Sequence, residues 1–110
     1  ISFGSEVVFE SANTSSNAIA YDANAQKVVI SYQDVGNSSH GTGIVGTVSG
    51  TSISFGTAVV FNAATTEEIA TTYDANAQKV VTAYRDGGNS NSGTAIVGTV
   101  SGTAIGMVNS

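Results

Sequence analysis

The 110-residue sequence has no cysteine, no proline and no tryptophan, and its only positively charged residues are Lys27, Lys79 and Arg85. Without cysteine, neither a disulfide framework nor a thiolate metal site can form. Eight acidic residues bring the formal net charge to −5, and so few Lys and Arg cannot build the positive cluster that nucleic-acid phosphates require. We therefore expect no nucleic-acid partner and no binding to an anionic membrane surface.

Long hydrophobic runs are also missing. No segment approaches the roughly 20 apolar residues that span a bilayer, and no basic stretch followed by an apolar one opens the chain. We expect no membrane insertion. The sequence begins at Ile1 rather than Met, which suggests a piece trimmed from a longer protein.

The sequence does contain a regular duplication. Tyr21 matches Tyr73, Tyr32 matches Tyr84, and the offset stays at 52 residues without a gap. The chain therefore divides into repeat 1 (1–52), repeat 2 (53–104) and the start of a third repeat (105–110), which we expect to form a single two-repeat unit. A period near 50 residues is typical of propeller blades rather than of helical repeats.

Within each repeat, apolar and small polar residues alternate with a period of two, as in pleated strands. Turn-forming residues separate these runs, so each repeat is predicted to form a four-stranded antiparallel blade. The fold class expected is all-β, a β-propeller with two blades per chain. The expected strands are 1–9, 18–21, 27–34, 42–48, 53–61, 70–73, 79–86 and 94–100.

The order of these strands predicts self-association. Strand 1–9 has no blade of its own, while the last blade lacks most of its outer strand. We expect the first strand of one chain, through Ile1, Phe3, Val7 and Phe9, to complete the last blade of the next by strand exchange. Because propellers have about four to eight blades, the ring would be a homodimer, homotrimer or homotetramer, and we favour the six-bladed homotrimer.

The amino-acid sequence of the repeat resembles a known class of repeats. The motif YDANAQKVV, followed by AIVGTVSGT or its close variant and ISFGT, resembles the tandem repeats of propeller-type proteins in cyanophage and marine phage genomes. This resemblance implies a virion-associated or extracellular module that serves as a host-surface adhesin, and it supplies no catalytic residues. A fragment or a designed two-repeat unit would also have this form, similar to the two-bladed fungal and bacterial lectins that trimerise into six-bladed rings.

Differences between the repeats gather in two predicted connections, 10–17 against 62–69 and 35–40 against 87–92, at one end of the strands. They indicate either a recognition rim or loops that simply tolerate change. Aspartates at the strand ends could bind glycan hydroxyls, or could cap the amides of their own loops. The candidate ligand-binding residues are Asp34, Asn37, His40, Asp86, Asn89 and Asn91.

No catalytic motif is present, so we expect no enzyme activity, no cofactor and no metal. His40 is the only histidine, and one imidazole does not make a transition-metal site. The alternating oxygens of Asp22, Asn24 and Gln26 superficially suggest a calcium loop, but a hairpin turn is the better interpretation because the glycine and distal acid are missing. The predicted function is a structural, self-assembling propeller module; the alternative is a carbohydrate-binding or host-surface-binding module.

Overall fold

The computed structural model describes residues 1–107, so the last three positions of the predicted third repeat lie outside the described residues. Every strand pairing is antiparallel, and within residues 1–107 no helix has the length and apolar character needed to cross a bilayer. In chain order the elements are β1 (Thr14–Asp22), β2 (Lys27–Asp34), η1 (Val35–Asn37), β3 (His40–Ser49), β4 (Ser52–Phe55), β5 (Val59–Asp74), β6 (Lys79–Asp86), β7 (Ser92–Ser101) and β8 (Ala104–Met107).

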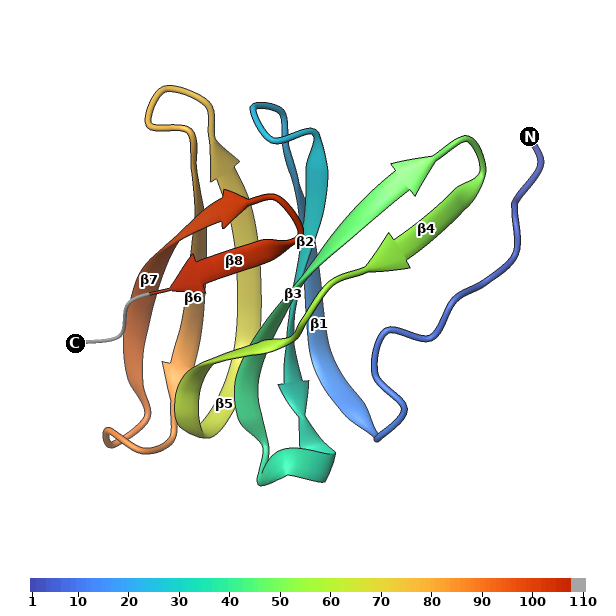
Figure 1. Cartoon of the computed structure of the whole chain (residues 1–110). Helices are drawn as coiled ribbons and strands as arrows, with labels where there is room; N and C mark the ends of the chain where they lie inside the picture. The colour runs from blue at the N-terminus through green and yellow to red at the C-terminus, as the bar shows by residue number, and fades with distance from the viewer. Residues whose placement is uncertain (108–110) are drawn as a thin grey trace.

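The strands form two layers that share β5. The hydrogen-bonded order is β1-β2-β3-β5-β6-β7-β8, with β4 also paired to β3. The start of β5 pairs with β3, and its later residues pair with β6. In Figure 1 the first layer (β1 to β4) therefore faces the second (the later part of β5 with β6, β7 and β8).

The core lies between these layers. Val29 and Val45 of the first layer pack against Val80 and Ile105 of the second. A second cluster joins Phe61 to Tyr84, whose ring centroids are 5.2 Å apart in an edge-on arrangement. Each repeat alternates its side chains between its two faces, so one face of each layer fills this core. On the other face of the first layer Ile30, Tyr32 and Ile44 form a third buried cluster, against which Phe9 and Phe55 pack.

The duplication predicted from the sequence extends to the backbone. Residues with positive φ are unusual outside glycine, and here they occur in pairs that are 52 residues apart. The pairs are Ser16 and Glu68, Gln26 and Gln78, Ser38 and Ser90, Ser39 and Asn91, and Gly50 and Gly102. The turns of the two repeats therefore share these unusual backbone conformations.

Three predicted strand boundaries were wrong. The strand expected at 18–21 begins earlier, at Thr14, as β1. The segment expected as one strand at 53–61 divides into β4 and β5, and Gly56 lies at the break, where its N–H donates to the Val45 carbonyl at 2.9 Å. The connection expected at 62–69 is instead the middle of β5. Pairing passes from β3 to β6 between Thr65, opposite His40, and Thr66, opposite Asp86, so no loop separates the two pairings. Register shifts in the β3–β5 pairing precede this point, and a bulge between Glu67 and Ala70 follows it.

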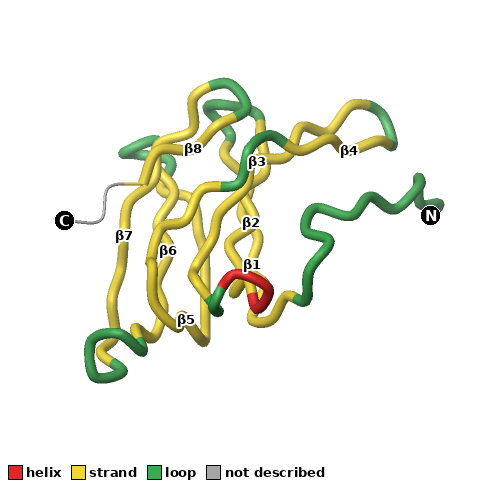
Figure 2. The backbone as a smooth tube through the Cα atoms, turned by 60° about the horizontal axis from the view of Figure 1, so that its bottom comes forward, coloured by secondary structure: helices red, strands yellow, loops and turns green. Residues whose placement is uncertain are grey.

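The strand expected at 1–9 is not present as a strand in the described chain. Residues 1–13 run along the outside of the first layer as an extended segment, as Figure 2 shows for the N-terminal end of the tube. A strand needs a neighbour for its backbone N–H and C=O groups, and none of the described strands pairs with this segment.

Candidate functional site

The loops predicted to carry a ligand lie at one end of the molecule. The β2–β3 and β6–β7 loops are at the bottom of Figure 1, whereas the β1–β2 and β5–β6 turns are at the top. Asn37, Asn89 and Asn91 are exposed on these lower loops, and His40 is half-buried. Three exposed amides are thus available to a polar ligand, although no described aromatic ring lies among them.

The two aspartates of this end are held by their own surroundings. Asp86 accepts hydrogen bonds at Oδ1 from the Gly88 N–H at 2.9 Å and from the Asn62 Nδ2 at 3.1 Å. Its role is therefore to fix its own loop, as the capping interpretation expects. Asp34 is only 8% exposed. The Asp34 carboxylate is therefore withdrawn from solvent, whereas Asp86 is half-buried and uses one oxygen for its own loop.

Asp34 lies in a less favourable environment than its counterpart. The position of Asn62 is taken in repeat 1 by Glu10, which accepts hydrogen bonds from the Tyr32 hydroxyl and from the Ala12 N–H, each at 3.2 Å. A carboxylate cannot donate as the Asn62 amide does, so Asp34 Oδ1 is buried without a hydrogen-bond partner. The neighbouring carboxyl groups of Glu10 and Asp34 repel each other when both are ionised, and repeat 2 lacks this repulsion because it has Asn62 in place of Glu10.

The titration of these groups reflects that repulsion. Burial comes first among the causes that raise the pKa of Asp34 above its ordinary value of 3.8, followed by the charge of Glu10 and by the hydrogen bond that the protonated carboxyl group makes with Glu10. The backbone N–H groups of Gly36 and Asn37 act in the opposite direction. Burial and the neighbouring Glu10 also raise the pKa of Tyr32 strongly. In repeat 2, burial and Asp86 raise the pKa of Tyr84.

The turn that superficially resembled a calcium loop is a hairpin turn. Asp22 Oδ1 accepts from the Ala25 N–H at 2.9 Å, and Asp74 Oδ1 accepts from the N–H groups of Asn76 and Ala77. These carboxylates cap the turn itself. Within residues 1–107, no group of three or more His, Cys, Asp or Glu side chains is placed to hold a metal ion.

The most unusual surfaces of the molecule are the two outer faces of the layers. On the second layer, Val97 is 53% exposed, whereas its repeat counterpart Val45 is fully buried between the layers. We call this surface the Val97 face; it consists of Val81, Ala83, Ala95 and Val97. The counterparts of its four residues are all buried in the interface between the layers: Val29, Ser31, Gly43 and Val45.

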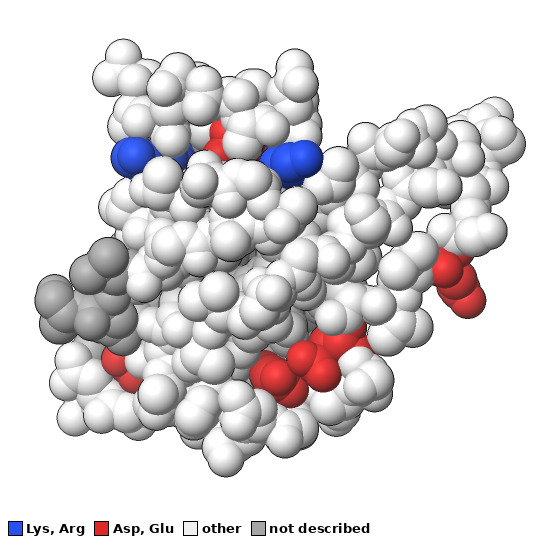
Figure 3. All heavy atoms as spheres, viewed as in Figure 1, with Lys and Arg blue, Asp and Glu red and all other residues white. Residues whose placement is uncertain are grey.

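The first layer has the complementary surface, which we call the Ile30 face. Its members are Ile19, Tyr21, Val28, Ile30 and Val48, and their counterparts on the second layer line the same interface from the other side: Thr71, Tyr73, Val80, Thr82 and Val100. Ile19, Tyr21 and Val48 are each more than half exposed. Charged groups are few on the side seen in Figure 3, where they lie toward the two ends of the molecule and on the N-terminal segment.

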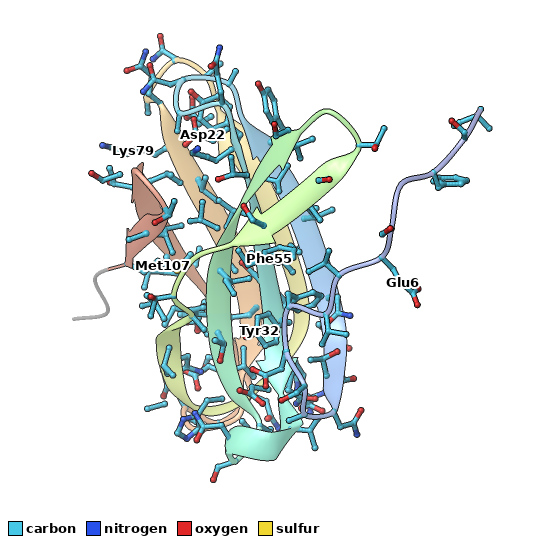
Figure 4. The ribbon with its side chains drawn as sticks, turned by 45° about the vertical axis from the view of Figure 1, so that its right-hand side comes forward. Glu6, Asp22, Tyr32, Phe55, Lys79 and Met107 are labelled. Carbon is cyan, nitrogen blue, oxygen red and sulfur yellow. The ribbon has the colours of Figure 1, made fainter. Side chains whose placement is uncertain are left out.

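The N-terminal segment crosses part of the Ile30 face. Phe9 packs edge-on against Tyr32 with ring centroids 5.1 Å apart, and it also contacts Phe55 at 5.8 Å. Figure 4 shows the labelled Tyr32 and Phe55 on the side of the sheet along which this segment runs. The contact repeats the packing of Phe61 on Tyr84, since Phe9 and Tyr32 are their counterparts.

The centre of the interface between layers is polar. Ser31 Oγ and Thr82 Oγ1 are 3.1 Å apart, and Thr82 Oγ1 is also 3.1 Å from Thr71 Oγ1. We call these three residues the hydroxyl triad. Their counterparts on the outer faces are all apolar and form what we call the apolar triad: Ala83, Ile19 and Ile30.

The sequence placed the candidate ligand-binding residues on the lower loops, and it did not single out the residues of the outer faces, Glu10 or the apolar triad. The signal was present, because a comparison at the 52-residue offset shows Asn62 replaced by Glu10 and all three triad hydroxyls replaced by apolar groups. What the sequence could not give was which of these positions face one another.

The structure defines an all-β protein of two repeat-related antiparallel layers. Comparisons with protein-family models, curated proteins and solved structures found no match for the chain. The two outer faces and the lower loops are the features of this structure that bear on its function.

Proposed function

We propose that this protein is a structural, self-assembling module that joins copies of itself head to tail into a closed β-propeller ring. In this assembly the Val97 face of one chain packs on the Ile30 face of the next. The observation that carries the proposal is that these two faces are the repeat counterparts of the two surfaces already packed together inside the chain. Each chain therefore carries both halves of an interface that it has itself formed once.

The proposed intermolecular seam is complementary in polarity. In the internal interface two hydrogen bonds join the hydroxyl triad, both of them at the Thr82 hydroxyl. At the seam the apolar triad would bring Ala83 against Ile19 and Ile30, so no hydroxyl would be buried without a partner. All three hydroxyl positions are apolar in their repeat counterparts, as expected if the three positions face one another both in the internal interface and at the seam.

A hydrogen bond between the layers also has an equivalent at the proposed seam. Inside the chain the Ile69 N–H donates to Ser16 Oγ at 2.8 Å. The counterparts are Asn17 on the Ile30 face and Glu68, which lines an open hollow of about 340 Å³ together with Ala83 and Arg85. A Glu68 carboxylate can accept from the Asn17 N–H of a second copy, so the seam keeps an acceptor at this point.

Head-to-tail contacts of this kind can close into a ring. Each chain has one face of each kind, and a head-to-tail contact between unlike faces forms a ring when the rotation between subunits closes. With two layers per chain and about four to eight blades in known propellers, the ring holds two, three or four chains. The six-bladed homotrimer remains our preferred form, and the predicted phage resemblance would make it part of a virion or an extracellular assembly.

A charged residue on the Val97 face tests this proposal. Val97→Asp leaves the charge in water in the isolated chain but would bury it without a partner at the seam, which costs about 3–5 kcal/mol per seam. The matched control is Val35→Asp, because Val35 is also partly exposed and its counterpart, Gly87, is exposed in this structure. Sedimentation velocity should show the Val97 variant as a monomer and the control as an oligomer; equal assembly of both would refute the docking of this face.

A second candidate function is carbohydrate or host-surface binding at the lower loops. It is favoured by the exposed amides of Asn37, Asn89 and Asn91, which lie at one end of the molecule. A glycan array with the assembled protein tests it, with a triple Asn→Ala variant as the comparison. Saturable binding that this variant loses would establish recognition, and absence of binding would leave the structural role alone.

A further inference from the structure

One edge of the second layer is left partly open. The strand β7 pairs with β6 from Ser92 to Gly98, but β8 covers its other edge only from Gly98 to Ser101. Residues 93–95 therefore have no strand partner on that edge among the described residues. In the first layer the counterpart edge, residues 41–43 of β3, is paired with the start of β5. An open strand edge exposes backbone N–H and C=O groups that can pair with another chain.

The N-terminal segment already lies in the position from which it could fill such an edge. In the first half of the chain Phe9 packs on Tyr32, as Phe61 packs on Tyr84 in the second. Gly4 lies so close to the Thr51 carbonyl that a Cβ there would overlap it, and Gly56 approaches the Thr103 carbonyl in the same way. Residues 4–9 therefore run over the first layer as residues 56–61 run over the second.

The difference between the two segments lies in their other neighbour. While Phe61 packs on Tyr84, the backbone around it pairs with β3, with Val59 opposite Gly43 and Val60 opposite Thr42. The segment around Phe9 has the same packing but no described strand beside it. What would stand beside it in the head-to-tail assembly is β7 of the neighbouring copy.

Only part of the N-terminal segment can pair with the neighbouring β7, because β8 already occupies the rest of that edge. The counterpart of residues 1–3 is β4, which pairs with the far half of β3. On β7 the chain's own β8 holds that position, with Ile105 opposite Val100 and only 3% exposed. Ile1 is fully exposed and Phe3 is 88% exposed, so the expected closing strand 1–9 is reduced to its second half.

We propose that residues 93–95 of β7 form a β-strand binding site that takes residues 7–10 of a second copy. The outer strand of each second layer is then composite, with β8 from its own chain followed by residues 7–10 of the neighbour. Applying the 52-residue offset to the pairs of β3 and β5 gives the register: Val7 opposite Ala95, Val8 opposite Thr94, and Glu10 opposite Gly93.

The composite strand needs no unusual geometry. In the first layer the outer strand is already interrupted between β4 and β5 at residues 56–58, and this is the place where the composite strand changes from one chain to the other. Addition of a strand to an open edge takes its affinity mainly from backbone hydrogen bonds, and its register comes from alternate side chains. Here Phe9, held by Tyr32 of its own chain, fixes the register.

The test is a disulfide across the proposed pair, in a chain that has no cysteine of its own. Val8→Cys combined with Thr94→Cys should give covalent oligomers on mild oxidation, reversed by dithiothreitol, and peptide mapping should recover the link between positions 8 and 94 from different chains. Val8 is 75% exposed and Thr94 half-buried, so thermal melting of the reduced double variant should match that of the unmodified chain.

A second pair tests the competing arrangement, in which the whole of 1–9 displaces β8. In that arrangement Ile1 lies opposite Val100, so Ile1→Cys combined with Val100→Cys would cross-link between chains. Such a link, or absence of the 8–94 link in an oligomeric protein, would overturn the composite strand.

This inference rests on the proposed head-to-tail assembly, and the native mass of the unmodified chain keeps the two apart. An oligomer without the 8–94 link refutes only the composite strand. A monomer refutes both proposals.

Discussion

The same substitution at two repeat-related glycines should have two different effects. Gly41 is buried, and a Cβ there would lie 2.7 Å from two ring atoms of Phe61 and 2.8 Å from Thr66 Oγ1. Its counterpart, Gly93, has no atom within 4 Å of an added Cβ. In the proposed ring, however, Phe9 of the neighbouring copy takes the place near Gly93 that Phe61 takes near Gly41.

The magnitudes follow from this geometry. Overpacking a filled interior costs about 1–3 kcal/mol, offset in part because replacing a strand glycine with alanine recovers roughly 0.5–1 kcal/mol. Gly41→Ala should therefore lower the free energy of unfolding by about 1–2 kcal/mol. Gly93→Ala should leave the stability of the isolated chain unchanged or slightly higher and weaken association by about 1–2 kcal/mol per seam, which is roughly 5-fold to 30-fold.

Two measurements on each variant check this prediction. Urea unfolding at a concentration where the chain is dissociated gives the stability, and sedimentation equilibrium gives the association constant. A Gly93→Ala variant that assembles as tightly as the unmodified chain would contradict the placement of Phe9 against β7. A Gly41→Ala variant with full stability would contradict the internal packing itself.

Three further predictions concern the seam and the acidic pair. Glu10→Gln supplies the amide that Asn62 supplies in repeat 2, so Asp34 Oδ1 gains a hydrogen-bond donor. The free energy of unfolding should therefore rise by about 1 kcal/mol at neutral pH. An unchanged urea midpoint would contradict this. The raised pKa of Asp34 means that the folded chain binds this proton more tightly than the unfolded chain does. The stability of the fold should therefore fall as the pH rises from the ordinary carboxyl pKa of 3.8 through the raised pKa. Glu10→Gln should flatten that pH dependence in thermal melts. Ala83→Ser should weaken association by about 1–3 kcal/mol per seam, because it places a lone hydroxyl against Ile19 and Ile30. Adding Ile30→Thr should recover part of that loss. A double-mutant cycle without coupling energy would show that these positions do not meet.

The strand content and the duplication could be predicted well from the sequence. The alternation within 27–34 and 79–86 gave β2 and β6 with their observed bounds, because these strands pair with neighbours on both sides and have turns at both ends. The aspartates at 22 and 74 were correctly assigned to turns, since their spacing lacks the residues that a calcium loop needs.

Three features could not be predicted from local pattern. β5 is continuous because the strand leaves β3 after Thr65 and joins β6 at Thr66 without a break, and the polar residues in that stretch resemble a loop. The 1–9 segment has the alternation of a strand but lacks a pairing partner within the described chain, and pairing is a property of the neighbour rather than of the segment. The burial of Asp34 depends on Glu10 and Tyr32, which come from different parts of the chain.

The candidate ligand residues illustrate the same limit. Asp34 and Asp86 end their strands as predicted, but burial of the first and internal hydrogen bonding of the second were set by contacts with residues 10 and 62. Asn37, Asn89 and Asn91 lie on exposed loops as expected, where a glycan remains an untested partner.

The native mass of the unmodified chain tests the central claim most directly. Native mass spectrometry at micromolar concentration should show a single closed species that is a whole multiple of the 11.0 kDa chain, with the trimer favoured. A folded monomer as the main species would contradict the account, because both outer faces and the open edge of β7 would then remain in water.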